Sequence, residues 1–266
     1  MDPAVIGLGV PQLHAEKSKD ISTGITFRSG ATFSAFFNFY HIKVKDRILF
    51  SGEVCFDGDD TITNPVEKVL IVNDITSMKF FINAFNTITK GVDIVLNYKN
   101  QEVGNGKLAF SLASNISSTK IDGQIATPSI LKSNGYDIFN CKEQGRILSA
   151  RPNTIVFLGI NYDLNKASFI FNNTYFGDVT WQHATDISKD QTFAEKIIKD
   201  LGFAYKVIST VSSNVMVKNL FNVYQDELDT KGDVVTGLGG GFKYAWEVNQ
   251  FGFSETTFSA GLNFKF

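Results

Sequence analysis

The sequence is short of cysteine, of charge imbalance and of long apolar runs, and each shortage argues against a class of protein. Two cysteines, Cys55 and Cys141, cannot build a disulfide framework, and they do not form a CxxC pair of the kind that binds zinc. No segment approaches the roughly 18 apolar residues that a membrane-spanning helix needs. A net charge of −2 argues against a nucleic-acid partner. Residues 1–10 lack the charged and apolar regions of a signal peptide.

Aromatic residues are plentiful, with 25 Phe against 2 Trp, and they fall into alternating segments. In five segments an apolar residue alternates with a polar or small one: residues 21–27, 92–98, 154–162, 201–205 and 258–266. Alternation with a period of two predicts strands with one apolar and one polar or small face.

Four of these five strands end on an aromatic residue followed at once by a basic one. The pairs are Phe27-Arg28, Tyr98-Lys99, Tyr205-Lys206 and Phe264-Lys265, and the fifth strand has Tyr162 followed by Asp163. An aromatic ring with a charge just beyond it suits a membrane–water interface. A soluble β-sandwich, which is the alternative fold, gives no reason for this repetition.

The connections alternate between short and long. Short turns are expected at residues 29–30, 100–106, 163–166 and 208–213, and they lead into strands at 32–45, 107–121, 167–180 and 215–222. Long polar loops are expected at residues 46–79, 122–151, 181–192 and 223–256. Short periplasmic turns and long outer loops are typical of outer-membrane barrels. The sequence therefore predicts an all-β, antiparallel transmembrane barrel fragment. Its nine strands are an odd number, which suggests a piece of a larger barrel.

One of these strands, residues 32–45, does not alternate cleanly. Phe36 and Tyr40 stand on the face opposite Phe33, Phe37 and Phe39. They indicate either a contact inside the barrel lumen or a β-bulge.

Several stretches resemble the C-terminal part of a TonB-dependent receptor, and they occur in that family's order. The stretches are residues 14–18, 39–48, 80–84, 89–93, 218–224 and 258–266. The residues that carry the two most recognisable motifs, with those that lead into them, are Asn83, Ala84, Gly91, Asp93, Asn219, Leu220, Phe221 and Asn222. Ala15 stands where the family usually has proline.

The resemblance implies a barrel of about 22 strands around an N-terminal plug. Such receptors import siderophore-bound iron, haem, cobalamin or glycans with energy from the TonB complex, which acts through the plug. Residues 1–266 would be the C-terminal part of the barrel, without signal peptide, plug or N-terminal strands. Phe258, Leu262, Phe264 and Phe266 resemble the signal that the barrel-assembly machinery reads. The expected partners are outer-membrane lipid, that machinery and a small ligand at the outer loops, with no cofactor.

An open piece of barrel has free edges at residues 21–27 and 258–266, because the last strand should pair with a first strand outside this chain. We therefore expect the isolated chain not to form a closed, heat-resistant monomer in detergent. A shift in gel mobility on heating would contradict this expectation.

Other candidate sites each have a plainer explanation. His14, His41 and His183 could ligate haem or metal, or could be solvated. Cys55 and Cys141 could pair in an oxidising compartment or stay unrelated. Residues 57–60 resemble a calcium loop whose ligand series breaks, and residues 237–241 are a glycine run without phosphate-loop spacing.

The remaining hypotheses concern function. Arg146, Arg151 and Trp181 lie in predicted outer loops and could contact a ligand at the rim. A porin-like channel without a plug is the alternative to an import receptor. An outer-membrane enzyme is a third hypothesis, but no catalytic constellation stands out.

Overall fold

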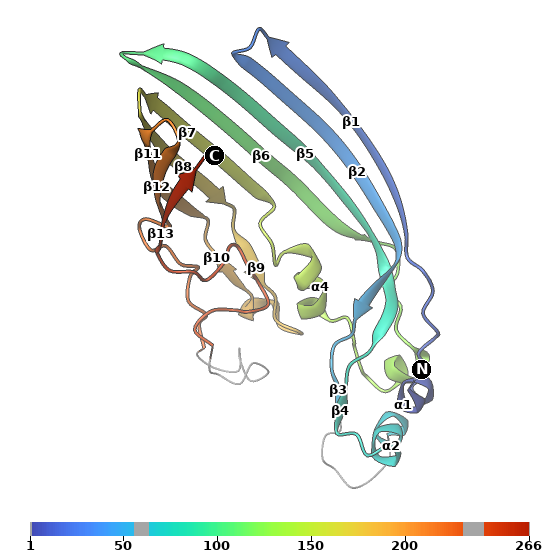
Figure 1. Cartoon of the computed structure of the whole chain (residues 1–266). Helices are drawn as coiled ribbons and strands as arrows, with labels where there is room; N and C mark the ends of the chain where they lie inside the picture. The colour runs from blue at the N-terminus through green and yellow to red at the C-terminus, as the bar shows by residue number, and fades with distance from the viewer. Residues whose placement is uncertain (1, 56–63, 231–241, 266) are drawn as a thin grey trace.

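The computed structural model describes residues 2–55, 64–230 and 242–265, and most of them lie in one antiparallel sheet (Figure 1). Its nine strands follow the order β1-β2-β5-β6-β7-β8-β11-β12-β13, in which every chain neighbour is also a sheet neighbour. Their bounds are β1 Lys17–Ser29, β2 Phe33–Phe50, β5 Phe81–Val103, β6 Gly106–Asp122, β7 Thr154–Leu164, β8 Ala167–Phe176, β11 Lys196–Ile208, β12 Val211–Lys218 and β13 Thr257–Phe264. The sheet is open, with β1 and β13 at its edges. This confirms the predicted barrel fragment.

The sheet has a turn end with short connections and a loop end with long ones, at the top and bottom of Figure 1. The sequence placed several boundaries wrongly. β5 continues to Val103, so residues 100–103 are strand rather than turn, and β12 already begins at Val211. β8 ends at Phe176, and residues 179–180 belong to a separate hairpin of β9 (Val179–Trp181) and β10 (Gln191–Phe193).

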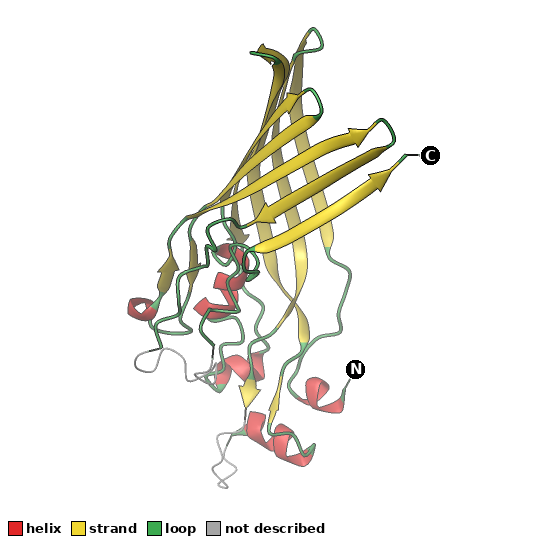
Figure 2. Cartoon of the chain, turned by 60° about the vertical axis from the view of Figure 1, so that its left-hand side comes forward, coloured by secondary structure: helices red, strands yellow, loops and turns green. Residues whose placement is uncertain are grey.

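The two faces of the sheet differ in chemistry. The register aligns the apolar residues of the predicted strands on one face, here called the outward face. Large apolar side chains on this face are open to solvent, with Ile25 72% and Phe258 73% exposed. The opposite, inward face carries polar side chains and is the concave side (Figure 2). On it, Asn115 donates a hydrogen bond to Asp93 at 2.7 Å.

The irregular face of β2 has a specific cause. Tyr40 lies directly opposite Gly91 on the inward face, in continuous register with β1 and β5, so no bulge occurs there. A Cβ added at Gly91 would stand 2.2 Å from the Tyr40 hydroxyl oxygen, so the ring covers the glycine. The hydroxyl also accepts a hydrogen bond from Asn115 at 3.0 Å. Tyr40 is thus an inward residue that packs on its own sheet, and of the two explanations offered by the sequence the bulge is wrong for it.

A bulge does occur further along β2, at Asp46, where the sequence placed the start of a loop. Asp46 adopts a positive φ of 55°, and the register shifts between Val44 and Ile48. Its backbone groups are satisfied from β5: Asn86 accepts from the Asp46 N–H at 2.9 Å, and Asn83 donates to the Asp46 carbonyl at 2.7 Å. The strand therefore continues to Phe50.

The long loops, which the sequence predicted as polar connections, contain helices and a hairpin of their own. They contain α2 Pro65–Val72, α3 Ser129–Ser133, α4 Cys141–Leu148 and the small hairpin of β3 (Val54–Cys55) and β4 (Ser77–Met78). The N-terminal helix α1 (Pro3–Gly7) joins them. Leu8, Leu70, Leu131 and Phe139 share one buried apolar cluster, which packs against the loop end of β5. Among the described residues, no helix is long and apolar enough to span a membrane.

The last loop is fixed at its base by Asn219. Asn219 has a positive φ of 51°, accepts a hydrogen bond from the Val223 N–H at 2.8 Å, and donates to the carbonyls of Val223 and Ser254. Its own carbonyl accepts from Thr256, just before β13. One buried asparagine therefore joins the two ends of this loop.

Candidate functional site

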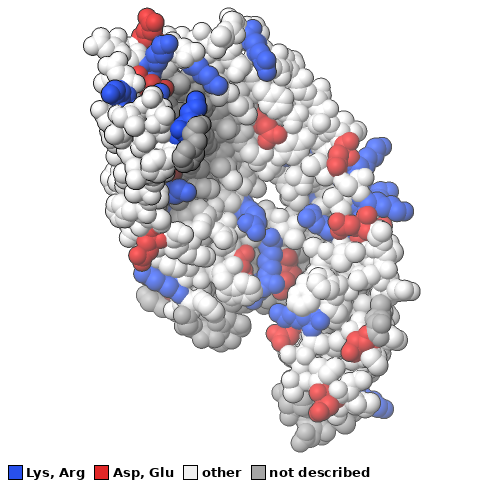
Figure 3. All heavy atoms as spheres, in the orientation of Figure 1, with Lys and Arg blue, Asp and Glu red and all other residues white. Residues whose placement is uncertain are grey.

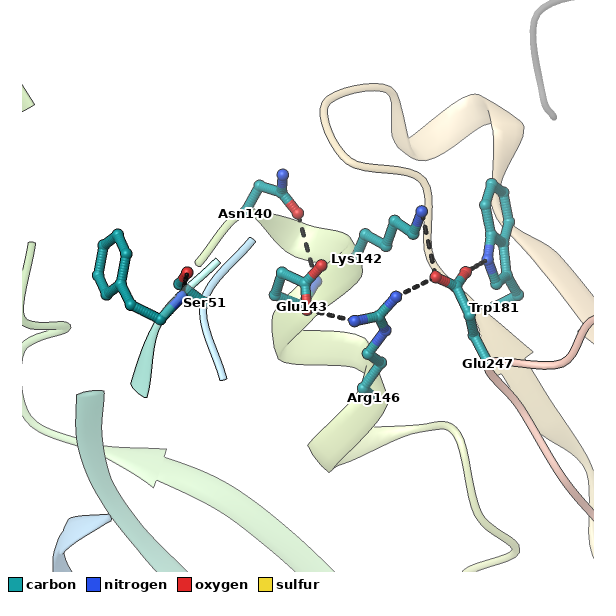
Figure 4. A network of polar contacts seen from close by, with 8 residues as sticks. Ser51, Asn140, Lys142, Glu143, Arg146, Trp181 and Glu247 are labelled. Atoms are coloured by element: carbon teal, nitrogen blue, oxygen red, sulfur yellow. Dashed lines mark hydrogen bonds and ion pairs between the residues drawn. The ribbon is translucent and has the colours of Figure 1, made fainter. Parts of the chain in front are cut away.

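The candidate site lies on the concave side of the sheet, where α4 folds inward from its loop. Asn140 caps this helix by accepting a hydrogen bond from the Glu143 N–H at 3.3 Å. The helix points Lys142 and Arg146 toward Glu247 of another loop (Figure 4). Just beyond the helix, the Ser117 N–H donates to the Asn153 carbonyl at 2.8 Å, which ties the loop to β6.

A buried carboxylate, Glu247, holds α4 against two other loops (Figure 4). Its side chain is only 1% exposed and pairs with Arg146 and with Lys142, the latter at 3.1 Å. The Trp181 indole of β9 donates to its second oxygen. Burial opposes the charge of Glu247, but the hydrogen bonds from Trp181 and Arg146 and the two cations outweigh it, so the pKa of Glu247 lies below its ordinary value.

Beside this network, α4 and the inward face enclose a cavity of about 300 Å³. It is lined by Arg47, Thr89, Ser117, Thr119, Arg146, Ile147, Leu148, Arg151, Pro152 and Asn153. Three guanidinium groups and three hydroxyls face it, and no carboxylate is among the described residues that line it. In Figure 3, Lys and Arg side chains lie beside Asp and Glu side chains around the position of α4.

The three arginines are not equally available. Arg146 is engaged by Glu143 at 2.7 Å and by Glu247. Arg47 donates to the Thr87 hydroxyl at 3.0 Å. Arg151 is exposed, and it makes no ion pair or hydrogen bond within the described part of the chain. Because guanidinium groups bind carboxylates and phosphates in a bidentate manner, the cavity suits an anionic, oxygen-rich group.

The structure brings together two of the three loop residues singled out from the sequence. Arg146 and Arg151 both line the cavity, whereas Trp181 is buried and positions Glu247 instead. Three other lining residues, Arg47, Thr89 and Thr119, lie on strands and were not predicted from the sequence. The only sequence feature that could have indicated them was a hydroxyl or charged side chain on the polar face of a strand. No sequence feature indicated Glu247, because its partners are distant in sequence.

The histidines and cysteines do not form a site. His14 lies 3.6 Å from Asp46, His41 is on the outward face of β2, and His183 accepts from backbone N–H groups of its own loop. No group of three or more potential metal ligands occurs in residues 2–55, 64–230 and 242–265. Cys55 and Cys141 are both free and exposed, so the structure contains no disulfide between them.

The motif residues have structural positions rather than cavity positions. Asn83 holds the bulge of β2 and also binds the His14 backbone at 2.9 and 3.0 Å, and Ala84 is buried. Gly91 lies under Tyr40, and Asp93 binds Asn115. Asn219 clamps the last loop, and Asn222 accepts from the Thr256 N–H. Two more motif residues stand between these asparagines, where Leu220 donates its N–H to the Lys199 carbonyl and the Phe221 ring faces Lys199.

The terminal strand is described only in part. Phe258, Leu262 and Phe264 lie on the outward face of β13 and are exposed. Phe266, the acidic run at 57–60 and the glycine run at 237–241 lie outside the described residues.

Comparison with known proteins now defines the class. The family model of the TonB dependent receptor-like β-barrel matches residues 2–223. The chain belongs to this family, whose members are receptors and transporters. No curated protein sequence matches the chain.

Solved structures share the fold at low sequence identity. They include the FrpB iron transporter from Neisseria meningitidis (F3-3 variant; TM-score 0.56, 14% identity, 95% of this chain and 31% of that chain). A second is a mutant of the ferric enterobactin receptor PfeA from Pseudomonas aeruginosa (TM-score 0.57, 16% identity, 96% and 32%). A third is the pyoverdine outer membrane receptor FpvA from Pseudomonas aeruginosa PAO1 (TM-score 0.53, 12% identity, 94% and 30%). The chain thus spans about a third of each of these structures.

Proposed function

We propose that this chain is the C-terminal barrel portion of an outer-membrane receptor that imports a scarce ligand with energy from TonB. Family membership and the open sheet support this proposal. The exposed apolar outward face supports the membrane location, because such a surface is stable against lipid rather than water. The plug, the signal peptide and the remaining strands would belong to the whole receptor.

The proposal about the chemistry of the ligand rests on the cavity beside α4. Arg47 and Arg151 keep donors available on the concave side, and hydroxyls of β5 and β6 surround them. An iron chelate with carboxylate or catecholate oxygens, which carries net negative charge, fits this chemistry better than a neutral ferric hydroxamate or a neutral glycan. The porin alternative has no support, because the matching family model and the similar structures are of receptors and transporters.

A growth assay tests this proposal. A strain lacking the whole receptor is grown on ferric citrate, a ferric catecholate, a ferric hydroxamate, haem or cobalamin as the limiting source. We expect one anionic iron chelate to require the receptor, and Arg151→Gln in the whole receptor to impair its uptake. Arg28→Gln, at the turn end, is the matched control. Uptake of all five sources without the receptor would refute the proposed function.

A further inference from the structure

The charges of α4 and of the last loop cancel one another beside the cavity. Arg146 pairs with Glu143 at 2.7 Å and also with Glu247 (Figure 4). Lys142 pairs with the same oxygen of Glu247 at 3.1 Å. We call these four residues the α4 cluster. It contains two cations and two carboxylates, so its formal net charge is zero.

Within the described part of the chain, Arg146 is the one member of the α4 cluster that lines the cavity. The side chains of Glu143 and Glu247 are 9% and 1% exposed, so they stand behind Arg146 rather than at the cavity surface. The Nε atom of Arg146 is itself buried and has no hydrogen-bond partner among the described residues. A ligand in the cavity therefore meets a guanidinium group whose charge is already offset from behind.

The two other arginines of the cavity keep their charge. Arg47 donates to the Thr87 hydroxyl, which is neutral, and forms no ion pair with any described residue. Arg151 is exposed and likewise has no ion pair in residues 2–55, 64–230 and 242–265. The cavity thus offers two uncompensated positive charges, although three arginines line it.

Acidic residues on the neighbouring strands do not change this balance. On β5, Asp93 lies four residues from Thr89, roughly 14 Å at about 3.4 Å per residue, and it accepts hydrogen bonds from two asparagine side chains. Asp46 precedes Arg47, but its carboxylate is 45% exposed and lies 3.6 Å from the His14 imidazole. Distance and solvent screening weaken the effect of both carboxylates on the cavity.

We propose that Glu143 and Glu247 determine the charge of the ligand that the cavity selects: it accepts anions that bring two negative charges and disfavours those that bring three. The Coulomb energy grows with the charge of the ligand, so each positive charge that these carboxylates cancel weakens a trianion more than a dianion. Both residues act through Arg146 and do not touch the ligand. This inference rests on the proposed anion-binding cavity and adds the charge of the ligand that it takes.

Two probes that differ by one carboxylate test the inference. Glutarate and tricarballylate share one dicarboxylate chain, and tricarballylate carries a third carboxylate at its centre. Calorimetry at about pH 8, where the carboxyl groups are ionised, measures the Kd of each probe for the whole receptor in detergent. The ratio of the two Kd values is compared between variants, because a general structural defect weakens both probes and leaves their ratio unchanged.

Glu247→Gln removes one negative charge while it keeps the size of the side chain and an oxygen that can accept from the Trp181 indole. We expect the preference for tricarballylate over glutarate to rise roughly fivefold, as one charge several ångströms from the ligand predicts. Glu143→Gln should shift the ratio in the same direction. Glu247→Gln combined with Arg146→Gln removes one charge of each sign, and it should restore the wild-type ratio.

Glu227→Gln is the matched control, because Glu227 lies in the same loop, pairs with Lys243 at 2.9 Å and does not line the cavity. Its ratio should equal that of the wild type. An unchanged ratio in both Glu247→Gln and Glu143→Gln, or an equal change in the control, would overturn the proposal. A wild-type receptor that binds neither probe would overturn it as well. A receptor that passes the growth assay and fails this test keeps its proposed function, so the two failures are distinguishable.

Discussion

The contact between Tyr40 and Gly91 makes a sharp prediction about the inward face. A Cβ at Gly91 would stand 2.2 Å from the Tyr40 hydroxyl oxygen and 2.3 Å from the adjoining ring carbon. Real contacts of this kind exceed about 3 Å, so Gly91→Ala must displace the ring. Overpacking of this kind costs about 1–3 kcal/mol. The displaced hydroxyl also loses the hydrogen bond from Asn115, which adds about 0.5–1.5 kcal/mol.

Removing the ring should reverse the sign of the effect. In a Tyr40→Ala background the space above residue 91 is open, and alanine is favoured over glycine in a strand by about 0.5–1 kcal/mol. The double-mutant cycle should therefore show a coupling energy of about 2 kcal/mol or more between the two positions.

Unfolding of the whole receptor by guanidinium, followed by circular dichroism of the sheet, measures these differences. Gly252→Ala is the matched control, because a Cβ there meets nothing within 4 Å. If Gly91→Ala has the same effect in both backgrounds, the ring does not cover residue 91 and the reasoning is refuted.

Three further predictions concern the loop end. The pKa of Glu247 lies below its ordinary value of 4.5, so the stability that its carboxylate gives is complete above pH 4.5 and is lost as the pH falls through the lowered pKa. Tryptophan fluorescence from Trp181 and Trp246 should change in that pH range, and Glu247→Gln should abolish the change. Asn219→Ala removes three side-chain hydrogen bonds and replaces a residue type that tolerates the left-handed conformation, so hydrogen exchange of the Val223 amide should accelerate at least tenfold. Asn134→Ala is the control, and unchanged exchange in Asn219→Ala would show that Asn219 does not clamp the loop. Cys55 and Cys141 are exposed at the loop end, so a membrane-impermeant maleimide should label both on intact cells; labelling only after lysis would contradict the proposed orientation.

Five strands could be predicted from alternation, because residues such as Ile94 and Leu96 must share one apolar face, and the other four from the short turns that lead into them. The strand ends were harder to predict, because the apolar alternation stops before the strands do. Asn100, Gln101 and Glu102 are polar on both faces, yet they remain in β5, since backbone pairing continues where the apolar pattern stops. The bulge at Asp46 was likewise taken for a loop.

The site was only partly predictable. Arg146 and Arg151 were singled out by their loop position, and both line the cavity. Arg47 and Thr89 come from strands, and they reach the same cavity only because the sheet curves around α4. Glu247 lies 101 residues from Arg146 in the chain, and no periodic pattern connects them. The loop cores escaped prediction similarly, because Leu8, Leu70 and Leu131 come from three separate segments.

The central claim is that the outward face of the sheet contacts lipid and the inward face lines an aqueous lumen. Spin labels on single cysteines introduced at positions 93 to 97, in a background with Cys55→Ser and Cys141→Ser, test it directly in reconstituted vesicles. Labels at Ile94→Cys and Leu96→Cys should collide with oxygen dissolved in the lipid. Labels at Asp93→Cys, Val95→Cys and Asn97→Cys, which lie on the inward face, should collide with a water-soluble nickel chelate. Accessibility that alternates with a period of two is the predicted result, and uniform accessibility to water along these five positions would contradict the account.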